Sequence, residues 1–312
     1  MADAPMREVA TFRKFFGLSR MTHSVLDVAH PAVGGALAAV VLGGAPSVRT
    51  IIMGLIAGFA GYTCVFALND VFDVKVDREK MARYRFEHAT FDLDSMGQRH
   101  PLAQNSLSYD AGIAWVVSWG LLSLVLAFLL RPICAGLLLG AIILETAYCK
   151  LLRVSHWKGL LSGLMVGVGG LAGVWAVTPA ARPSMVLVFF AWAFAWEIGA
   201  RNIPNDWSDL EEDKHLGIRT VPVRYGQKAA SWISFAFVSA VIVLSFLFPL
   251  VAPIPQTVLY LAGAAATGIA LLLVPMSRWL HRQTPDEALR FFNMACFYPL
   301  ATFAWLTVSV LV

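Results

Sequence analysis

The sequence predicts an all-α, polytopic membrane protein with nine transmembrane helices. Of its 312 residues, 58% are hydrophobic and only 14% are charged, and the mean hydropathy is +0.67. Soluble domains carry about 25% charged residues, so this composition is typical of a chain that lies in lipid. A backbone in lipid must satisfy its own hydrogen bonds, which leaves helices or closed barrels. The apolar runs are continuous, whereas barrel strands alternate apolar and polar residues, so we expect helices.

Nine apolar runs have the length of about 20 residues that a spanning helix needs. In chain order they predict helices over 24–44, 50–70, 110–130, 132–152, 158–178, 183–204, 228–250, 256–276 and 290–311. Charged residues bound several of them, since no charge lies between Arg49 and Asp70, between Asp110 and Arg131, between Lys158 and Arg182, or after Arg290. The longest uncharged stretch runs from Lys228 to Arg278 and has room for two helices. Prolines at 249, 253 and 255 mark the break between them.

The loop charges predict the orientation. With nine helices, one face of the membrane carries the N-terminus and every Lys and Arg except Arg49, Arg131 and Arg182. The positive-inside rule places that face in the cytoplasm, and we expect a bacterial cytoplasmic membrane. Residues 1–23 form a predicted N-terminal segment whose mixed aromatic and basic residues suit a helix on the membrane surface, and residues 24–312 form one transmembrane domain. The net charge of +4 follows from this topology, so we expect no nucleic-acid partner.

Acidic residues concentrate in two segments on the same face. The first aspartate motif covers residues 69–77 and is followed by a loop over 78–108; the second covers 205–213 within a loop over 205–227. Both read Asn-Asp-x-x-Asp-x-x-x-Asp, and they stand 136 residues apart. Chance does not readily repeat four fixed polar positions in a chain with 20 acids. The repeat indicates two related halves with a shared role.

The spacing within each motif predicts a metal site. If each helix continues past the membrane surface, positions i, i+4 and i+8 share one face. The predicted metal ligands are Asn69, Asp73, Asp77, Asn205, Asp209 and Asp213, and the four aspartates among them are the predicted catalytic residues. Asp70, Asp206 and Glu197 are expected to orient these ligands without binding the metal themselves. Hard oxygen ligands favour Mg²⁺ or Ca²⁺, and Mg²⁺ typically takes one or two carboxylates plus substrate phosphates. A solvated acidic helix end is the usual meaning of one such motif, but not of two identical ones.

Basic residues flank both motifs. Arginine offers paired N–H donors to phosphate oxygens, and the predicted diphosphate ligands are Arg78, Arg99, Lys150, Arg153, Arg201 and Arg219. Each of them alone would mark a helix end equally well; the set around two carboxylate motifs points to phosphate. Inside the predicted helices, Glu197 and Arg201 are four residues apart and are expected to pair. Glu145, Asp27 and His30 have no evident partner.

These residues resemble the UbiA superfamily of intramembrane prenyltransferases over most of the chain. The matching positions are Asn69, Asp73, Asp77 and Arg78 in the first motif, Asp209 and Asp213 in the second, and Gly217-Ile-Arg219-Thr220 after it; Tyr148 to Arg153 and Arg99 to Ser108 resemble two further family segments. The resemblance implies a helical bundle around a central cavity, capped by cytoplasmic loops. Two departures put the subfamily in doubt. An insertion, 78–98, replaces the usual handful of residues, and the family's Ser-Gly pair is absent from 99–108.

The resemblance also implies an activity. The chain is expected to move an isoprenyl group from a polyprenyl diphosphate, with Mg²⁺ as cofactor, to a lipophilic acceptor. An aromatic acceptor, as in quinone or related lipid biosynthesis, is the most populated option in the family. A terpene cyclase with the same fold stays open, because it would ionise its substrate with the same residues. An ion-coupled transporter with an inverted repeat is disfavoured, because both motifs lie at the membrane surface and both motif helices run in the same direction.

Overall fold

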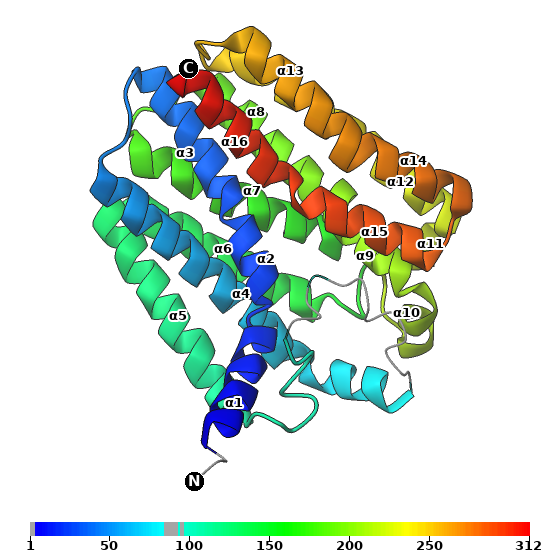
Figure 1. The fold of residues 1–312 in the computed structure, drawn as a ribbon. Helices are drawn as coiled ribbons and strands as arrows, with labels where there is room; N and C mark the ends of the chain where they lie inside the picture. The colour runs from blue at the N-terminus through cyan, green and yellow to red at the C-terminus, as the bar shows by residue number, and fades with distance from the viewer. Residues whose placement is uncertain (1–3, 84–92, 94–96) are drawn as a thin grey trace.

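The computed structural model is a bundle of membrane-length helices (Figure 1) and describes residues 4–83, 93 and 97–312. Within these residues nine helices are long and apolar enough to cross a membrane, as the sequence predicts. The spans are α2 with α3 (Met21–Asp27, Ala29–Leu42), α4 (Val48–Arg83), α5 (Tyr109–Leu130), α6 (Pro132–Lys150), α7 (Lys158–Val177), α8 with η2 and α9 (Pro183–Trp196, Glu197–Asn202, Ile203–Ser208), α12 (Gln227–Val251), α13 with η3 and α14 (Thr257–Thr267, Gly268–Leu273, Val274–Arg282), and α15 with α16 (Pro285–Cys296, Tyr298–Leu311). Helices α1 (Ala4–Leu18), α10 (Leu210–Leu216) and α11 (Val221–Tyr225) lie outside the spans.

Short-range signals explain where several helices begin and end. Ser108 precedes α5, and its side chain accepts a hydrogen bond of 3.2 Å from the backbone nitrogen of Ala111, which satisfies one of the free N–H groups of the first turn. Prolines stand in the first turn of α6 and α8, where no backbone donor is lost. Gly43 ends α3 in the left-handed conformation with φ 69°, which glycine adopts without strain. These local rules set the helix lengths.

Two kinds of contact hold the bundle together. Helices α3 and α7 touch through glycine, because a Cβ at Gly173 would collide with the carbonyl of Pro31. Such small residues let helix backbones approach closely in lipid. Buried indoles make the second kind of contact: Trp192 and Trp196 are fully buried. Their indole nitrogens donate to Ser245 Oγ at 2.9 Å and to the carbonyl of Ala295 at 3.0 Å, so each buried indole has a partner.

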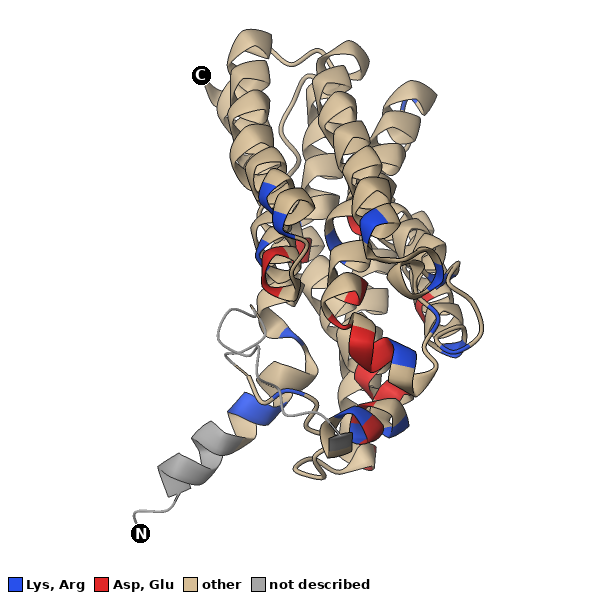
Figure 2. Ribbon diagram, turned by 90° about the vertical axis from the view of Figure 1, so that its right-hand side faces the viewer, with Lys and Arg blue, Asp and Glu red and all other residues tan. Residues whose placement is uncertain are grey.

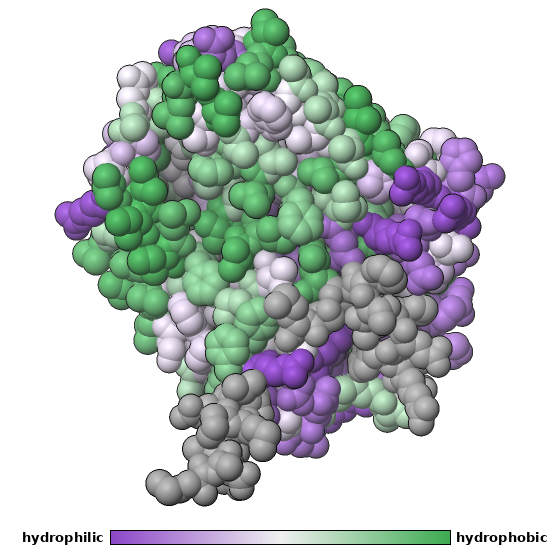
Figure 3. All heavy atoms as spheres, viewed as in Figure 1, coloured by the Kyte–Doolittle hydropathy of each residue, from purple (hydrophilic) through white to green (hydrophobic). Residues whose placement is uncertain are grey.

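Charged residues gather at one end of the bundle. Figure 2 shows Lys, Arg, Asp and Glu concentrated from the middle of the bundle downward, whereas its uppermost part is almost free of them. In Figure 3 the side of the bundle is mainly hydrophobic, and hydrophilic residues mass at the same lower end. The N- and C-termini lie at opposite ends (Figure 1), as an odd number of spans requires. We call the end with both aspartate motifs the charged end.

Most of the insertion predicted over 78–98 lies outside the described residues. Its first six residues, 78–83, continue α4 without a break. At its far end the backbone nitrogen of Gln98 donates to the carbonyl of Arg13 in α1 at 3.0 Å. The second predicted helix, 50–70, is therefore too short: α4 runs through the whole first motif and leaves the apolar region as a helix.

Candidate active site

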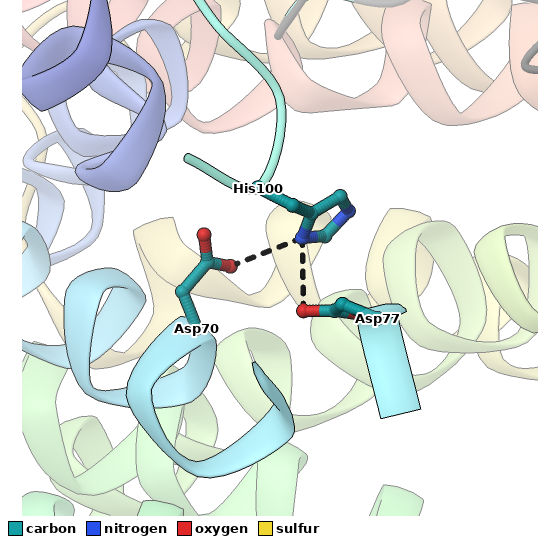
Figure 4. A group of neighbouring side chains, drawn as sticks. All are labelled: Asp70, Asp77 and His100. Carbon is teal, nitrogen blue, oxygen red and sulfur yellow. Dashed lines mark ion pairs between the residues drawn. The ribbon is translucent and has the colours of Figure 1, made fainter. Parts of the chain in front are cut away.

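The first aspartate motif lies on an unbroken helix. Because α4 extends to Arg83, Asn69, Asp73 and Asp77 lie on successive turns of one face, as predicted. Asp70 and Asp77 are seven residues apart and also converge. The ring nitrogen Nδ1 of His100 lies 3.5 Å from Asp70 Oδ1 and 3.0 Å from Asp77 Oδ2 (Figure 4). Asp70 thus shares a contact with Asp77 and does not stand behind it.

The second motif departs from the predicted continuous helix. The sixth span contains a π-helical stretch, η2, then α9, and the helix is interrupted at Asp209, whose φ and ψ are −96° and 11°. The backbone nitrogens of Asp209 and Asp213 still donate to the carbonyls of Asn205 and Asp209 at 3.3 and 2.9 Å. The i, i+4 relation therefore survives the break. Asp206 and Asp213 are buried, whereas Asn205 is exposed.

The two motifs face each other across one polar cavity. Its volume is about 230 Å³, and all eight Asn and Asp positions of the motifs line it. Lys80, one turn beyond Asp77 on α4, reaches across: its Nζ lies 3.3 Å from Asp209 Oδ2, 3.6 Å from Asp213 Oδ1 and 4.0 Å from Glu212 Oε2. Segments far apart in the sequence are thereby brought within the length of one lysine side chain.

Burial and neighbouring charges shift the pKa values of three groups outside the spans, His100, Asp209 and Asp213. Burial disfavours the charged form of His100, but the carboxylates of Asp70 and Asp77 outweigh it and raise the His100 pKa to about 9. Burial likewise acts to raise the Asp209 pKa, but the charges of Lys80 and Arg99 outweigh it and lower that pKa. For Asp213, burial together with the neighbouring carboxylates of Asp206 and Asp209 exceeds the effect of Lys80 and raises the pKa to about 8. His100 is therefore a cation at neutral pH.

The predicted diphosphate ligands divide into two groups. Arg99 and Arg201 line the polar cavity. The remaining four are exposed and do not line it: Arg78 donates to Asn105, Arg153 pairs with Glu79 at 2.6 Å, Arg219 donates to the carbonyl of Val154, and Lys150 ends α6. Their proximity to the motifs in sequence does not bring their side chains into the cavity.

Four cations in the cavity wall were not predicted: Arg20, Lys80, His100 and Lys158. Lys80 follows Asp77 by three residues, and residues three or four apart share one face of a helix. The spacing rule that selected the aspartates would therefore have found Lys80 as well. Lys158 is buried, donates to Tyr148 at 3.1 Å and lies 3.3 Å from Asp206 Oδ1. The sequence shows it only as a charge at a helix end.

The donor chemistry of the cavity fits a hard divalent cation. Ten Asp and Glu side chains line it, against five Lys and Arg. Burying carboxylates without matching positive charge costs free energy, so additional cations bound in the cavity would stabilise it. Oxygen donors of this kind suit Mg²⁺. Oxygen atoms of Asp70 and Asp77 lie, together with one ring nitrogen of His100, within 4.8 Å of one another.

An apolar cavity adjoins the polar one. Its volume is about 860 Å³, at the upper end of the usual range for ligand pockets, which is about 300–1,000 Å³. It runs among α3, α4, α7 and α16 from the middle of the bundle to residues 43–46 and Leu311 at the uncharged end. Both cavities are lined by Tyr62, Val65, Met165 and Val166. A polar chamber and a long apolar chamber thus share one wall inside the bundle.

The sequence matches the model of the UbiA prenyltransferase family over residues 28–300. This is most of the chain, so the protein belongs to that family. Digeranylgeranylglyceryl phosphate synthase of Methanosarcina mazei is 26% identical over 240 residues, which are 76% of this chain and 75% of the relative. 4-Hydroxybenzoate geranyltransferase 1 of Lithospermum erythrorhizon is 23% identical over 168 residues, 54% of this chain and 50% of the relative.

Solved structures share the fold. A UbiA homologue from Aeropyrum pernix superposes with a TM-score of 0.74 at 19% identity, covering 92% of this chain and 98% of that one. A UbiA homologue from Archaeoglobus fulgidus bound to GPP and Mg²⁺ gives a TM-score of 0.68, also at 19% identity, and covers 96% and 99% of the two chains. The nine-helix architecture is that of the family.

Proposed function

We propose that this member of the UbiA prenyltransferase family transfers an isoprenyl group from its diphosphate to an aromatic acceptor, with Mg²⁺ as cofactor. The observation that carries the proposal is the pair of adjoining cavities. One chamber is lined by both aspartate motifs, and the other is apolar and long. A prenyl diphosphate has the same division into a charged head and an apolar tail, so its reacting carbon would lie near the shared wall.

In this proposal the metal ligands are the predicted ones: Asn69, Asp73, Asp77, Asn205, Asp209 and Asp213. Mg²⁺ held there supplies positive charge to the diphosphate oxygens as the leaving group departs. The A. fulgidus homologue bound to GPP and Mg²⁺ supports both the donor class and the cofactor. Asp70 and Asp206 join the ligand-bearing wall, because both are buried and line the same cavity.

The chain's own cations complete the head-group site. Lys80, Arg99 and Lys158 line the cavity beside the motifs, and each can donate to a diphosphate oxygen and absorb charge as the C–O bond breaks. Arg201 lies farther in and is already engaged by Asp27, so we assign the diphosphate to the other three. The apolar walls exclude water from the allylic cation, which protects it from hydrolysis.

The aromatic acceptor is supported by the cavity wall. Tyr62, Phe66 and Phe292 line the polar cavity, and the rings of Tyr62 and Phe66 are stacked with centroids 6.3 Å apart. Such faces suit a planar ring. We place the charged end in the cytoplasm of a bacterium, on the distribution of Lys and Arg, and treat residues 24–312 as one catalytic domain with 1–23 as a surface segment.

The test uses purified protein in lipid nanodiscs with an aromatic acceptor and geranyl diphosphate labelled in the prenyl group. We expect release of diphosphate with Mg²⁺, none with EDTA, and full recovery when Mg²⁺ is restored. Undiminished release in EDTA would contradict the metal site. Product analysis without any acceptor separates the alternative of a cyclase, because a cyclase forms a cyclic hydrocarbon or alcohol from the labelled donor alone.

A further inference from the structure

Three charged side chains in the wall of the polar cavity, none of them part of an aspartate motif, form a cluster. Asp27 ends α2, and Glu197 and Arg201 belong to η2. Arg201 Nη1 lies 2.5 Å from Asp27 Oδ2 and 3.7 Å from Glu197 Oε2. All three side chains are buried and line the cavity. Ionisable groups inside membrane spans are costly and usually functional. We call these three residues the inner cluster.

The inner cluster leaves two hydrogen-bond acceptors open. Glu197 Oε1 accepts from Ser162 Oγ at 2.5 Å. Asp27 Oδ1 and Glu197 Oε2 accept no hydrogen bond from any group in the described part of the chain. Because buried polar atoms in folded proteins are nearly always hydrogen-bonded, the two open oxygens indicate that a donor from outside the chain completes the cluster.

The backbone holds the inner cluster in place. Glu197 and Arg201 lie in a π-helical stretch, a rare conformation that often occurs at functional sites. Ser234 of α12 donates to the carbonyl of Gly199, at the centre of this stretch. A Cβ at Gly199 would collide with the Cβ of Phe237. The π-helical turn is therefore fixed against α12, and the orientation of both charged side chains is set before any ligand binds.

Aromatic rings stand beside the inner cluster. The guanidinium carbon of Arg201 lies 5.1 Å from the ring centroid of Phe66. Phe66 stacks with Tyr62, whose side chain is in the wall shared by the two cavities. The phenolic oxygen of Tyr62 also has no hydrogen-bond partner among the described residues. The space combines flat apolar walls with carboxylate oxygens at its end.

We propose that the inner cluster is the acceptor subsite, and that it takes an uncharged aromatic alcohol such as a hydroquinone. The inference rests on the proposed prenyl transfer and deepens it. The acceptor hydroxyl donates to Glu197 Oε2 or Asp27 Oδ1, and its ring lies along Phe66 and Tyr62. Arg201 cannot serve as an anion site, because two carboxylates already surround it and the cluster carries one net negative charge. A carboxylate or phosphate on the acceptor would be repelled.

The cluster also supplies a base for the reaction. The hydroxyl proton passes to Glu197 Oε2, and the electron pair of the resulting phenolate forms a C–C bond from the adjacent ring carbon to C1 of the prenyl group. The C1–O bond breaks, and diphosphate leaves with its electron pair. The ring is then a dienone; the proton on its substituted carbon moves to the carbonyl oxygen, which restores the phenol, and one proton stays on Glu197.

Two matched acceptors test the charge argument. Hydroquinone and 4-hydroxybenzoate differ in one substituent, a hydroxyl against a carboxylate. With geranyl diphosphate and Mg²⁺ we expect hydroquinone to have a kcat/KM at least about tenfold higher. A prenylated glyceryl phosphate is the third acceptor, since several relatives are digeranylgeranylglyceryl phosphate synthases. Preference for either anionic acceptor, or transfer to none of the three while diphosphate is released, overturns the inference.

Variants then test the residues. Glu197→Gln should lower kcat/KM for hydroquinone by about a hundredfold, as expected for loss of a general base, and should raise the relative use of 4-hydroxybenzoate, because it removes the repelling charge. A purely structural role for Glu197 would not change the preference. Ser162→Ala keeps every charge and removes one hydrogen bond to Glu197; we expect a loss of about tenfold for hydroquinone. An unchanged preference in Glu197→Gln and an unchanged rate in Ser162→Ala refute the assignment.

Glu287→Gln is the matched control. Glu287 is also buried and pairs with an arginine, Arg282, at 2.6 Å, but it lines neither cavity. It should leave the acceptor preference unchanged. Mg²⁺-dependent binding of geranyl diphosphate, measured in every variant, reports on the donor site independently of the acceptor. Wild-type protein that releases no diphosphate with Mg²⁺ in the presence of any of the acceptors would refute the proposed function itself, whereas normal release with the wrong acceptor preference refutes only the acceptor subsite.

Discussion

Asp213 tests whether the second motif acts through specifically placed metal ligands or only through its negative charge. An exposed acid two residues away, Glu211, serves as its control. The Asp213 side chain is 4% exposed, lines the polar cavity and lies 3.6 Å from Lys80. Glu211 is 69% exposed and pairs with Lys214 at 2.8 Å. Asp213→Asn and Glu211→Gln each replace one carboxyl group of the same helix by an amide of nearly the same volume.

The structure predicts very different costs. A carboxylate that holds a metal beside the leaving group contributes several kcal/mol to stabilising the transition state. A loss of about 4 kcal/mol corresponds to about a thousandfold in rate. We expect a fall of that size for Asp213→Asn. Exposed ion pairs contribute little, so Glu211→Gln should change the rate by about twofold at most. Lys80 keeps Asp209 at 3.3 Å in the first variant, so the fold should survive.

The assay measures prenyl transfer at saturating Mg²⁺ in nanodiscs, with the unfolding midpoint of each variant recorded in detergent. The expected result is inactive but stable Asp213→Asn protein beside active Glu211→Gln protein. Equal losses in the two variants would mean that bulk negative charge is what α10 supplies, and the reasoning from burial and geometry would fail.

Three further predictions follow from the fold and the cavities. Asp206→Asn should destabilise the protein by about 3 kcal/mol, because it leaves the buried ammonium of Lys158 without its carboxylate; a thermal midpoint equal to wild type would contradict this. Gly54→Phe places a ring in the apolar cavity, where nothing lies within 4 Å of the added Cβ, about 22 Å along the helix from Asn69; it should abolish turnover of long prenyl donors and spare dimethylallyl diphosphate. Cysteines introduced at positions 181 and 212 should label from opposite sides of the membrane, with the four native cysteines buried and unreactive; labelling from one side would contradict the nine-span topology.

The sequence predicts the membrane architecture well, because the backbone of every span must satisfy its own hydrogen bonds in lipid. Each uncharged run had to become a helix, and the family match and the fold comparisons confirm the all-α bundle. The positions at which the helices end were less predictable. The segment after Asp70 is charged and is expected to be a loop on hydropathy alone, yet α4 continues to Arg83. Its last six residues, 78–83, are all good helix formers, which need no lipid to stay helical.

The interior of the site was harder to predict, because it depends on contacts between distant segments. The partner of Asp27 is Arg201, which lies 174 residues away, and no local spacing indicates that pair. His100 shares one nitrogen between Asp70 and Asp77, but in the sequence it is a single histidine in a loop. The interruption at Asp209 also has no signal of its own. Local spacing selected the motifs; only the fold selects the cations that face them.

The charge balance of the polar cavity explains why these cations matter. Ten acids and five Lys and Arg line it, protonated His100 adds one positive charge, and Asp213, whose pKa is raised to about 8, carries little charge at neutral pH. The inner cluster holds one of the excess negative charges, so most of the imbalance falls at the two motifs, where Lys80 and His100 each contact two or more carboxylates. A diphosphate entering this space alone would add further negative charge to a site that is already acidic. Under the proposed function, divalent cations would have to arrive before the donor or with it, so we expect metal to be a condition for binding the donor as well as for breaking its C–O bond.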